Sequence, residues 1–172
     1  LSMSGEEPAQ IGLREDMISS PRIDNISSCA AIMELCVRAT CDKHLNIGIC
    51  YDHEEIGSRT KQGAGSAILT DVIEKIYESM GWTARTAKDA IYQGLMVSCG
   101  CGACPASKSC GKSRLTSQPI MGDGFAIKEA ASQSYATDCE AIGIVEQIAR
   151  ANGIAYQKYT NRSDIVGGGT FG

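Results

Sequence analysis

The hydrophobic and polar positions of this chain follow two alternating periods along most of its length. Apolar residues recur at the helical spacing of three and four in four segments: 25–40, 63–80, 86–95 and 136–151. Short apolar runs bounded by polar or glycine residues are typical of strands, and four occur: 46–51, 95–98, 125–128 and 154–160. Because helices alternate with strands, we predict an α/β fold with a mixed β-sheet flanked by helices.

The strand predicted at 46–51 ends in a cluster of ionisable residues. Asp52-His53-Glu54-Glu55 follows it directly, and α/β sheets carry their chemistry where strands end. Adjacent carboxylates repel one another unless cations hold them, which favours a metal site. A dinuclear hydrolase needs one carboxylate as a ligand and another, unligated, that takes a proton from metal-activated water. Glu55 and Glu54 could fill these two roles, and a solvated acidic turn is the alternative.

A second candidate site opens the first predicted helix. The sequence SPRIDN at 20–25 directly precedes the apolar positions of that helix. Asp24 could cap the helix, since an aspartate at this position accepts hydrogen bonds from the free backbone amides of the first turn. It could instead bridge two metal ions, in which case its carboxylate would belong to the same site as the glutamates.

Four groups of residues stand in a fixed order over nearly the whole chain. They are SPRIDN at 20–25, YDHEEIGS at 51–58 with QGA at 62–64, GFAIK at 124–128 with QSYATD at 133–138, and RSDIVGGGT at 162–170. This ordered set resembles the aspartyl aminopeptidase family of dinuclear zinc exopeptidases. The resemblance implies the zinc-exopeptidase fold. It also implies a hydrolase that removes N-terminal residues, acidic ones in particular, from peptides, and that forms homo-oligomers.

The resemblance further implies roles for particular residues. Asp24 would bridge two zinc ions, or other divalent metals, while Glu55 would bind one of them and Glu54 would be the general base. Four further residues would lie near bound substrate: Lys128, Tyr135, Gly168 and Thr170. Two of these have an ordinary structural alternative, since Lys128 could be a solvated strand residue and Tyr135 a core aromatic with a polar tip.

Three ligands that the family supplies are absent from this sequence as written. They are a histidine from before an inserted lid domain, an aspartate from an Asp-x-Ala-His stretch, and a histidine near the C-terminus. We therefore expect an internal fragment, in which residues 1–19 are the exit from an inserted lid or dimerisation domain, or a linker, and residues 20–172 are an incomplete catalytic domain. The chain by itself is expected to be inactive, because zinc sites need three or four protein ligands.

Cysteines crowd the segment where the family carries its Asp-x-Ala-His stretch. Four of the nine cysteines fall within twelve residues: Cys99, Cys101, Cys104 and Cys110. Thiolates suit zinc or an iron–sulfur centre, so a non-catalytic metal-binding module is one alternative for this chain. The spacing matches no paired Cys-x-x-Cys zinc module, and the small residues between the cysteines offer few groups that could support metal ligands.

A frameshift accounts for the cysteine-rich segment better. With suitable synonymous codons for residues 98–113, reading one base later gives Ala-Asp-Val-Ala-His-Ala-Leu-His-Pro-Asn-His-Ala-Glu-Lys. The codons of Gly100 and Cys101 together then restore the aspartate, and those of Ala103 and Cys104 restore the first histidine. We interpret the segment as the result of two compensating single-base changes, in the gene or in its sequencing, that scrambled a metal-binding stretch.

Composition narrows the remaining function classes. The 172 residues, 43% of them hydrophobic, suffice for one domain, and a net charge of -4 without a basic stripe argues against nucleic-acid binding. No apolar stretch is long enough to span a membrane. Nine cysteines less the four in the suspect segment leave an odd, scattered set typical of reduced thiols, which predicts a cytoplasmic protein. A catalytically dead subunit that is kept for assembly is a further alternative.

Overall fold

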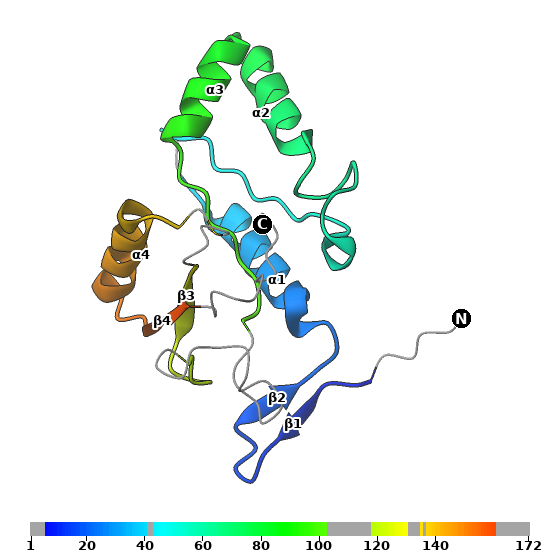
Figure 1. Cartoon of the computed structure of the whole chain (residues 1–172), viewed down its shortest axis with the longest axis vertical. Coiled ribbons are helices and arrows are strands. Elements are labelled where there is room, and N and C mark those ends of the chain that lie inside the picture. The colour runs from blue at the N-terminus through cyan, green and yellow to red at the C-terminus, as the bar shows by residue number, and fades with distance from the viewer. Residues whose placement is uncertain (1–5, 41–42, 103–117, 131–134, 136, 161–172) are drawn as a thin grey trace. The chain divides into compact units, whose positions relative to one another are not determined.

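The computed structural model describes residues 6–40, 43–102, 118–130, 135 and 137–160. The chain divides into two compact units, residues 1–50 with 99–101 and residues 51–98 with 102–172, and each is described by itself. The order of elements is two strands, a helix, a short 3₁₀ turn, two helices, and then a strand, a helix and a strand (Figure 1). No described helix is both long and apolar enough to cross a membrane.

The first unit begins with a β-hairpin that the sequence pattern does not predict. Strands β1 (Ala9–Ile11) and β2 (Met17–Ser19) pair antiparallel, with Gln10 opposite Ile18 at their centre. Each strand has only three residues, and all of them are exposed. An alternation of apolar and polar positions needs four or more residues to be recognised, so strands this short leave no clear signal.

Helix α1 (Ile23–Arg38) confirms the helix predicted over 25–40, and the run that follows packs against it. A Cβ atom on Gly48 would lie 2.3 Å from Cys36 Sγ and 2.8 Å from Ile32 Cγ2, so a side chain there would require Cys36 or Ile32 to shift. The strand predicted over 46–51 is wrong, because this run has no hydrogen-bonded strand partner among the described residues. Its apolar pattern predicts burial, but a strand also needs a neighbour for its backbone N–H and C=O groups.

The second unit contains a parallel β-α-β motif. Strand β3 (Phe125–Glu129) leads through helix α4 (Cys139–Ala151) to strand β4 (Tyr156–Thr160). The two strands pair in parallel along their full length, from Phe125 opposite Tyr156 to Glu129 opposite Thr160. Parallel neighbours need a crossover connection of this kind, which α4 supplies. The predictions of a strand, a helix and a strand in this region are confirmed.

The β-α-β motif has its own small core. Ile127 of β3, Ala149 of α4 and Tyr159 of β4 are all buried. Asp138 caps α4, since its carboxylate accepts a hydrogen bond from the Ala141 backbone N–H at 2.8 Å. A cap of this kind satisfies one of the free amides of the first turn, so the start of the helix is fixed by a local signal.

Helices α2 (Ile68–Ser79) and α3 (Ala84–Gln93) form a helical hairpin in the second unit, where the helical spacing predicts two helices. Ala87 of α3 is fully buried, which allows the two helices to approach closely. Thr83 caps α3 by accepting a hydrogen bond from the Thr86 N–H at 3.2 Å. The hairpin is therefore specified by a cap and by a small residue at its contact.

The described strands form two separate two-stranded sheets instead of the single mixed sheet that the sequence predicts. One sheet is antiparallel (β1 with β2) and the other is parallel (β3 with β4). The strand predicted over 95–98 is wrong for the same reason as the one at 46–51: the run is exposed and has no strand partner among the described residues. The α/β class itself is confirmed, since helices and strands alternate along the chain.

Candidate active site

The acidic motif forms a short turn that presents two exposed glutamates. Glu54–Ile56 make one turn of 3₁₀ helix, and the Gly57 N–H donates to the Glu54 carbonyl at 2.9 Å. His53 and Gly57 bracket the turn in left-handed backbone conformations, with φ of 64° and 92°. The carboxylates of Glu54 and Glu55 have no hydrogen bond or ion pair within the described part of the chain. Both are therefore available as ligands or as a base.

A hydrogen-bonded loop supports this turn. His53 Nδ1 lies 2.7 Å from Thr60 Oγ1, and the His53 backbone N–H donates to Asp52 Oδ1 at 2.8 Å. Ser58, which is 7% exposed, donates its N–H to the His53 carbonyl at 3.0 Å and accepts from the Gly65 N–H at 3.0 Å. His53 is thus engaged on both its ring and its backbone, and it anchors the loop that carries the two glutamates.

The same loop explains why the QGA motif has a glycine at position 63. A Cβ atom on Gly63 would lie 2.2 Å from the Ser58 carbonyl oxygen, far inside normal contact distance. Only glycine lets two backbone segments approach this closely. The Ser66 hydroxyl then donates to the Gly63 carbonyl at 2.7 Å, and Ala64 is buried. In the sequence, QGA is only one part of the family pattern. In the structure, this motif fixes the shape of the loop that carries Glu54 and Glu55.

Asp24 lies in an irregular turn at the start of α1 and caps no helix. The residue at the N-cap position is Arg22, with φ of 61° and no side-chain capping bond. Asp24 and Asn25 have non-helical backbone angles, with φ/ψ of -85°/107° and -126°/29°. The Asp24 carboxylate is exposed and has no partner among the described residues. The capping alternative for Asp24 is therefore wrong, and its metal-binding role stays a prediction.

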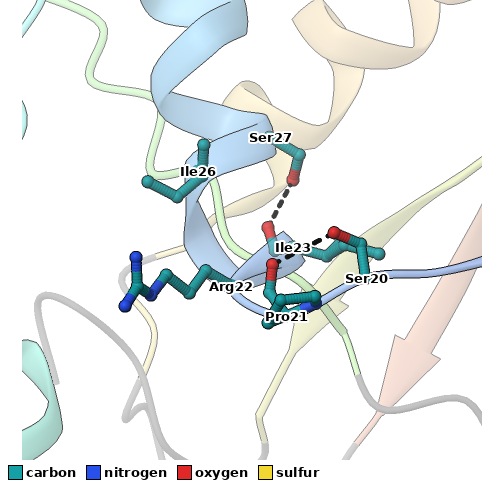
Figure 2. Close-up of a pocket in the computed structure, with 6 residues that line it drawn as sticks. All are labelled: Ser20, Pro21, Arg22, Ile23, Ile26 and Ser27. Atoms are coloured by element: carbon teal, nitrogen blue, oxygen red, sulfur yellow. Dashed lines mark hydrogen bonds between the residues drawn. The ribbon is translucent and has the colours of Figure 1, made fainter. Parts of the chain in front are cut away.

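An open hollow beside Asp24 is lined by six residues: Ser20, Pro21, Arg22, Ile23, Ile26 and Ser27. Figure 2 shows that its two hydroxyls turn toward backbone carbonyls, while the Arg22 side chain extends away from them. Ser20 Oγ donates to the Pro21 carbonyl at 3.2 Å, and Ser27 Oγ donates to the Ile23 carbonyl at 2.8 Å. Because both hydroxyl protons are used locally, the hollow offers no converging set of donors for a ligand.

The start of the cysteine-rich segment packs against the Asp24 turn within the first unit. Asn25 Nδ2 donates to the Cys99 carbonyl at 3.0 Å. Cys101 Sγ donates to the Ile23 carbonyl at 3.5 Å and lies 3.5 Å from Ser27 Oγ. Residue 100, between these contacts, is therefore next to the turn that carries Asp24. In the shifted reading frame, the codon of residue 100 supplies the first bases of the codon for the restored aspartate.

Several predicted site residues lie outside the described residues: Cys104, Cys110, Gly168 and Thr170. For the four-cysteine module, the structure therefore describes only Cys99 and Cys101, both of which are exposed and unpaired. Among the residues that the structure describes, no group of three His, Cys, Asp or Glu side chains that could hold a metal ion includes either cysteine. The module remains a prediction from the sequence.

Two residues expected near substrate contact each other in the second unit. The Lys128 ammonium of β3 lies 4.5 Å from the centre of the Tyr135 ring, a cation–π contact. Burial raises the pKa of the nearby Tyr159 phenol, and Tyr135 adds to this rise. The contact orients the Lys128 charge, which suits either an anion-binding role or a structural one.

The described residues supply metal-binding atoms of the right kind but not a complete zinc site. The carboxylates of Asp24, Glu54 and Glu55 are oxygen donors that zinc accepts. Within residues 6–40, 43–102, 118–130, 135 and 137–160, however, no three His, Cys, Asp or Glu side chains come close enough together to hold a metal ion. Asp24 belongs to the first unit and the glutamates to the second. The three carboxylates therefore suit zinc as individual ligands, although the described residues do not form a complete zinc site.

The family comparison identifies the class of protein. The family described as aminopeptidase I zinc metalloprotease (M18) matches residues 1–172, so the chain belongs to the M18 family of metallo-aminopeptidases, which are hydrolases. A probable M18 family aminopeptidase 2 from Clostridium acetobutylicum is 35% identical over 162 residues, which are 94% of this chain and 37% of that protein. A probable aspartyl aminopeptidase from Ricinus communis is 29% identical over 168 residues, 94% of this chain and 34% of that protein.

Solved structures support the fold. The cryo-EM structure of the Ape4 and Nbr1 complex matches with a TM-score of 0.73 and 24% identity, covering 97% of this chain and 33% of that chain. The crystal structure of prApe1 matches with a TM-score of 0.71 and 21% identity, covering 97% and 36%. The family resemblance and the α/β fold are thus confirmed. The chain spans about a third of the length of these relatives, from 33% to 37%.

Proposed function

We propose that this chain provides part of the active site of a zinc aminopeptidase that removes N-terminal residues, acidic ones in particular, from peptides. The observation that carries this proposal is the match of all 172 residues to a family of zinc aminopeptidases. The geometry supports it locally, because a rigid loop holds the Glu54 and Glu55 carboxylates exposed and unpaired among the described residues. Asp24 is likewise exposed rather than used as a helix cap.

Each carboxylate has a distinct role in this proposal. Asp24 would be a ligand shared by two zinc ions, and Glu55 would be a ligand of one of them. When bound, the zinc ions act as Lewis acids that polarise the scissile carbonyl and make water acidic enough to ionise near neutral pH. Glu54 accepts the proton from the attacking water and returns it to the leaving amine. The Asp52–Ser58 loop keeps Glu54 in place, since His53 and Ser58 are both hydrogen-bonded within it.

Lys128 is the candidate for recognition of an acidic N-terminal side chain. Its ammonium is held over the Tyr135 ring at 4.5 Å. A positioned ammonium pairs with a carboxylate more strongly than a mobile one, because less side-chain entropy is lost on binding.

We also propose that the protein is a cytoplasmic homo-oligomer. The six described free cysteines suit a reducing compartment such as the cytoplasm.

The 172-residue chain by itself should not turn over substrate. Its described residues offer Asp24 and Glu55 as ligands, and catalytic zinc sites have three protein ligands. We expect no release of aspartate from an aspartyl anilide above the buffer rate when zinc is supplied. Turnover that is abolished by Glu54→Gln would instead show that the present ligands suffice, and would still support Glu54 as the base.

A gain-of-binding experiment tests the site directly. A Cβ atom on Gly100 would meet nothing within 4 Å, and the same is true of Gly102. Gly100→Asp introduces a carboxylate next to Asp24, at the position where the shifted reading frame encodes an aspartate. Gly102→Asp is the control, because it adds the same charge at a position that does not contribute to that aspartate. Mn²⁺ is the probe, because thiolates compete poorly for it. Isothermal titration should show Gly100→Asp binding Mn²⁺ about tenfold more tightly than the parent, about 1.4 kcal/mol.

Two controls separate the outcomes. Asp24→Asn in the Gly100→Asp background should remove the gain, while Gly102→Asp should bind like the parent chain. An equal gain in both glycine variants would reduce the effect to net charge and would count against a metal site at Asp24. Resequencing the gene across residues 98–113 then decides whether the restored aspartate and histidine are encoded.

A further inference from the structure

Three of the described cysteines gather where α1 meets the run that follows it. Cys29 and Cys36 are seven residues apart on α1, which places them two turns apart on one face of the helix. The later run touches this face, since a Cβ atom on Gly48 would lie 2.3 Å from Cys36 Sγ and 2.8 Å from Ile32 Cγ2. All three cysteines, with Cys50 as the third, are unpaired, and none is fully buried.

The Gly48 contact also indicates which thiol Cys50 can reach. Cys50 lies two residues beyond Gly48, a step of at most about 7 Å. Cys29 lies nearly one turn from Ile32, about 4.5 Å along the helix axis. The two thiols are therefore within reach of each other. Hydrogen bonding to Cys29 raises the pKa of the Cys50 thiol, with burial and the more distant Cys36 adding to the rise.

We propose that Cys29 and Cys50 form a reversible disulfide bond, which makes this pair a redox-sensitive modification site. The oxidant is a low-molecular-weight disulfide such as oxidised glutathione. One cysteine thiolate attacks a glutathione sulfur and releases one glutathione thiol, and the second cysteine then attacks the mixed disulfide and releases the other. The protein S–S bond replaces the glutathione S–S bond. The two thiol protons of the protein end on the two glutathione thiols, so atoms and electrons balance.

Cys36 is the natural alternative partner, and the geometry disfavours it. The Cys36 sulfur lies against the backbone of Gly48, since a Cβ atom on Gly48 would be only 2.3 Å from it. Cys50 is two residues further along the chain, and Cys29 affects the pKa of its thiol more than Cys36 does. A bond between Cys29 and Cys50 would also close a loop between two segments that border the acidic residues, since Cys29 follows Asp24 by five positions and Cys50 precedes Glu54 by four.

Peptide mapping of the whole chain tests the proposal. After incubation with oxidised glutathione and alkylation of the remaining thiols, trypsin places Cys50 in peptide 44–59 and both Cys29 and Cys36 in peptide 23–38. The expected product is these two peptides joined by a disulfide. Cys29→Ser should lower the yield of the joined pair at least about tenfold, while the matched variant Cys36→Ser should keep it within about twofold.

Each other outcome overturns the assignment. A joined pair that survives Cys29→Ser and disappears in Cys36→Ser would make Cys36 the partner. Peptides that carry glutathione but are never joined would show that the two thiols cannot meet. Bond formation as fast in denaturing guanidinium as in buffer would show that the fold does not bring them together. These last two results come from the wild-type chain, so they hold even if a serine variant fails to fold.

Discussion

The β-α-β motif and the apolar runs at 46–51 and 95–98 have similar sequence patterns but opposite structural outcomes. In the motif, β3 and β4 pair along their full length, and Ile127 and Tyr159 are buried. The two runs are also apolar, yet neither has a strand partner in the described parts of the chain. Leu95, Met96 and Val97 are each more than half exposed. An apolar pattern is therefore not sufficient for a strand, because a hydrogen-bonded partner decides whether the strand forms.

The difference lies in where the partner comes from along the chain. The partner of β3 is β4, which α4 brings back within about thirty residues, a separation usual for a β-α-β unit. The runs at 46–51 and 95–98 have no such return within the described residues. Substitutions at the buried positions of the β-α-β motif should therefore lower stability much more than substitutions in the exposed runs. The reason is that the stability of the motif is concentrated in a few buried contacts.

The largest effect should come from truncating one buried side chain of the motif. Ile127 is 7% exposed and Val97 is 62% exposed. Ile127→Ala should lower the free energy of unfolding of the motif by about 2–4 kcal/mol, because it removes buried methyl groups and leaves a cavity. Val97→Ala should change stability by less than about 0.5 kcal/mol. Hydrogen exchange of the β3 and β4 amides measures both, and equal losses would show that the run at 95–98 is packed.

A somewhat smaller effect should come from the loop that carries the two glutamates. Gly63→Ala would push a methyl group to 2.2 Å from the Ser58 carbonyl oxygen, so one of the two backbone segments must move. We expect a loss of about 1–3 kcal/mol in local stability, as for other overpacked sites. Gly100→Ala is the matched control, since a Cβ atom there meets nothing within 4 Å. Unchanged hydrogen exchange of the Ser58 and Gly65 amides in Gly63→Ala would contradict the close approach.

Two aspartates at the starts of helices offer a third test. The Asp138 carboxylate accepts the Ala141 N–H at 2.8 Å, whereas Asp24 caps nothing in the described structure. Asp138→Ala should therefore destabilise α4 by about 1 kcal/mol, the usual cost of losing a helix cap. Asp24→Ala should leave the stability of α1 nearly unchanged. Circular dichroism during thermal unfolding compares the two variants, and a similar loss in both would restore the capping role of Asp24.

Sequence reasoning predicts the helices and the β-α-β motif because their signals are local. The Asp138 cap, the helical spacing of α2, α3 and α4, and the apolar runs of β3 and β4 lie within or next to each element. The hairpin of β1 and β2 escapes detection because three-residue, fully exposed strands have no periodicity to read. The failed strands at 46–51 and 95–98 depend on hydrogen-bond partners that no local pattern specifies.

The candidate site divides in the same way. The motifs point to Asp24, Glu54 and Glu55, and the structure shows all three carboxylates exposed. The sequence does not predict that Ser58 and Thr60 hold the glutamate loop, because their role rests on hydrogen bonds to His53 that only the folded loop reveals. The glycine of the QGA motif is a signal in the sequence for the close backbone approach that shapes this loop.

The smallest predicted effect concerns an ion-pair cluster on the β-α-β motif. Glu146 of α4 lies 2.9 Å from Lys158 Nζ and 3.0 Å from Arg150, and Lys158 is the main cause of a lowered Glu146 pKa. A lowered pKa stabilises the fold above the ordinary carboxyl value of 4.5, and this contribution is lost as the pH falls through the lowered value. Glu146→Gln should therefore lower the Tm at pH 7, and the gap from wild type should close under acid conditions. Glu140→Gln, at an exposed glutamate of the same helix, is the control. A gap of the same size at both pH values would mean that Glu146 acts through packing rather than through charge.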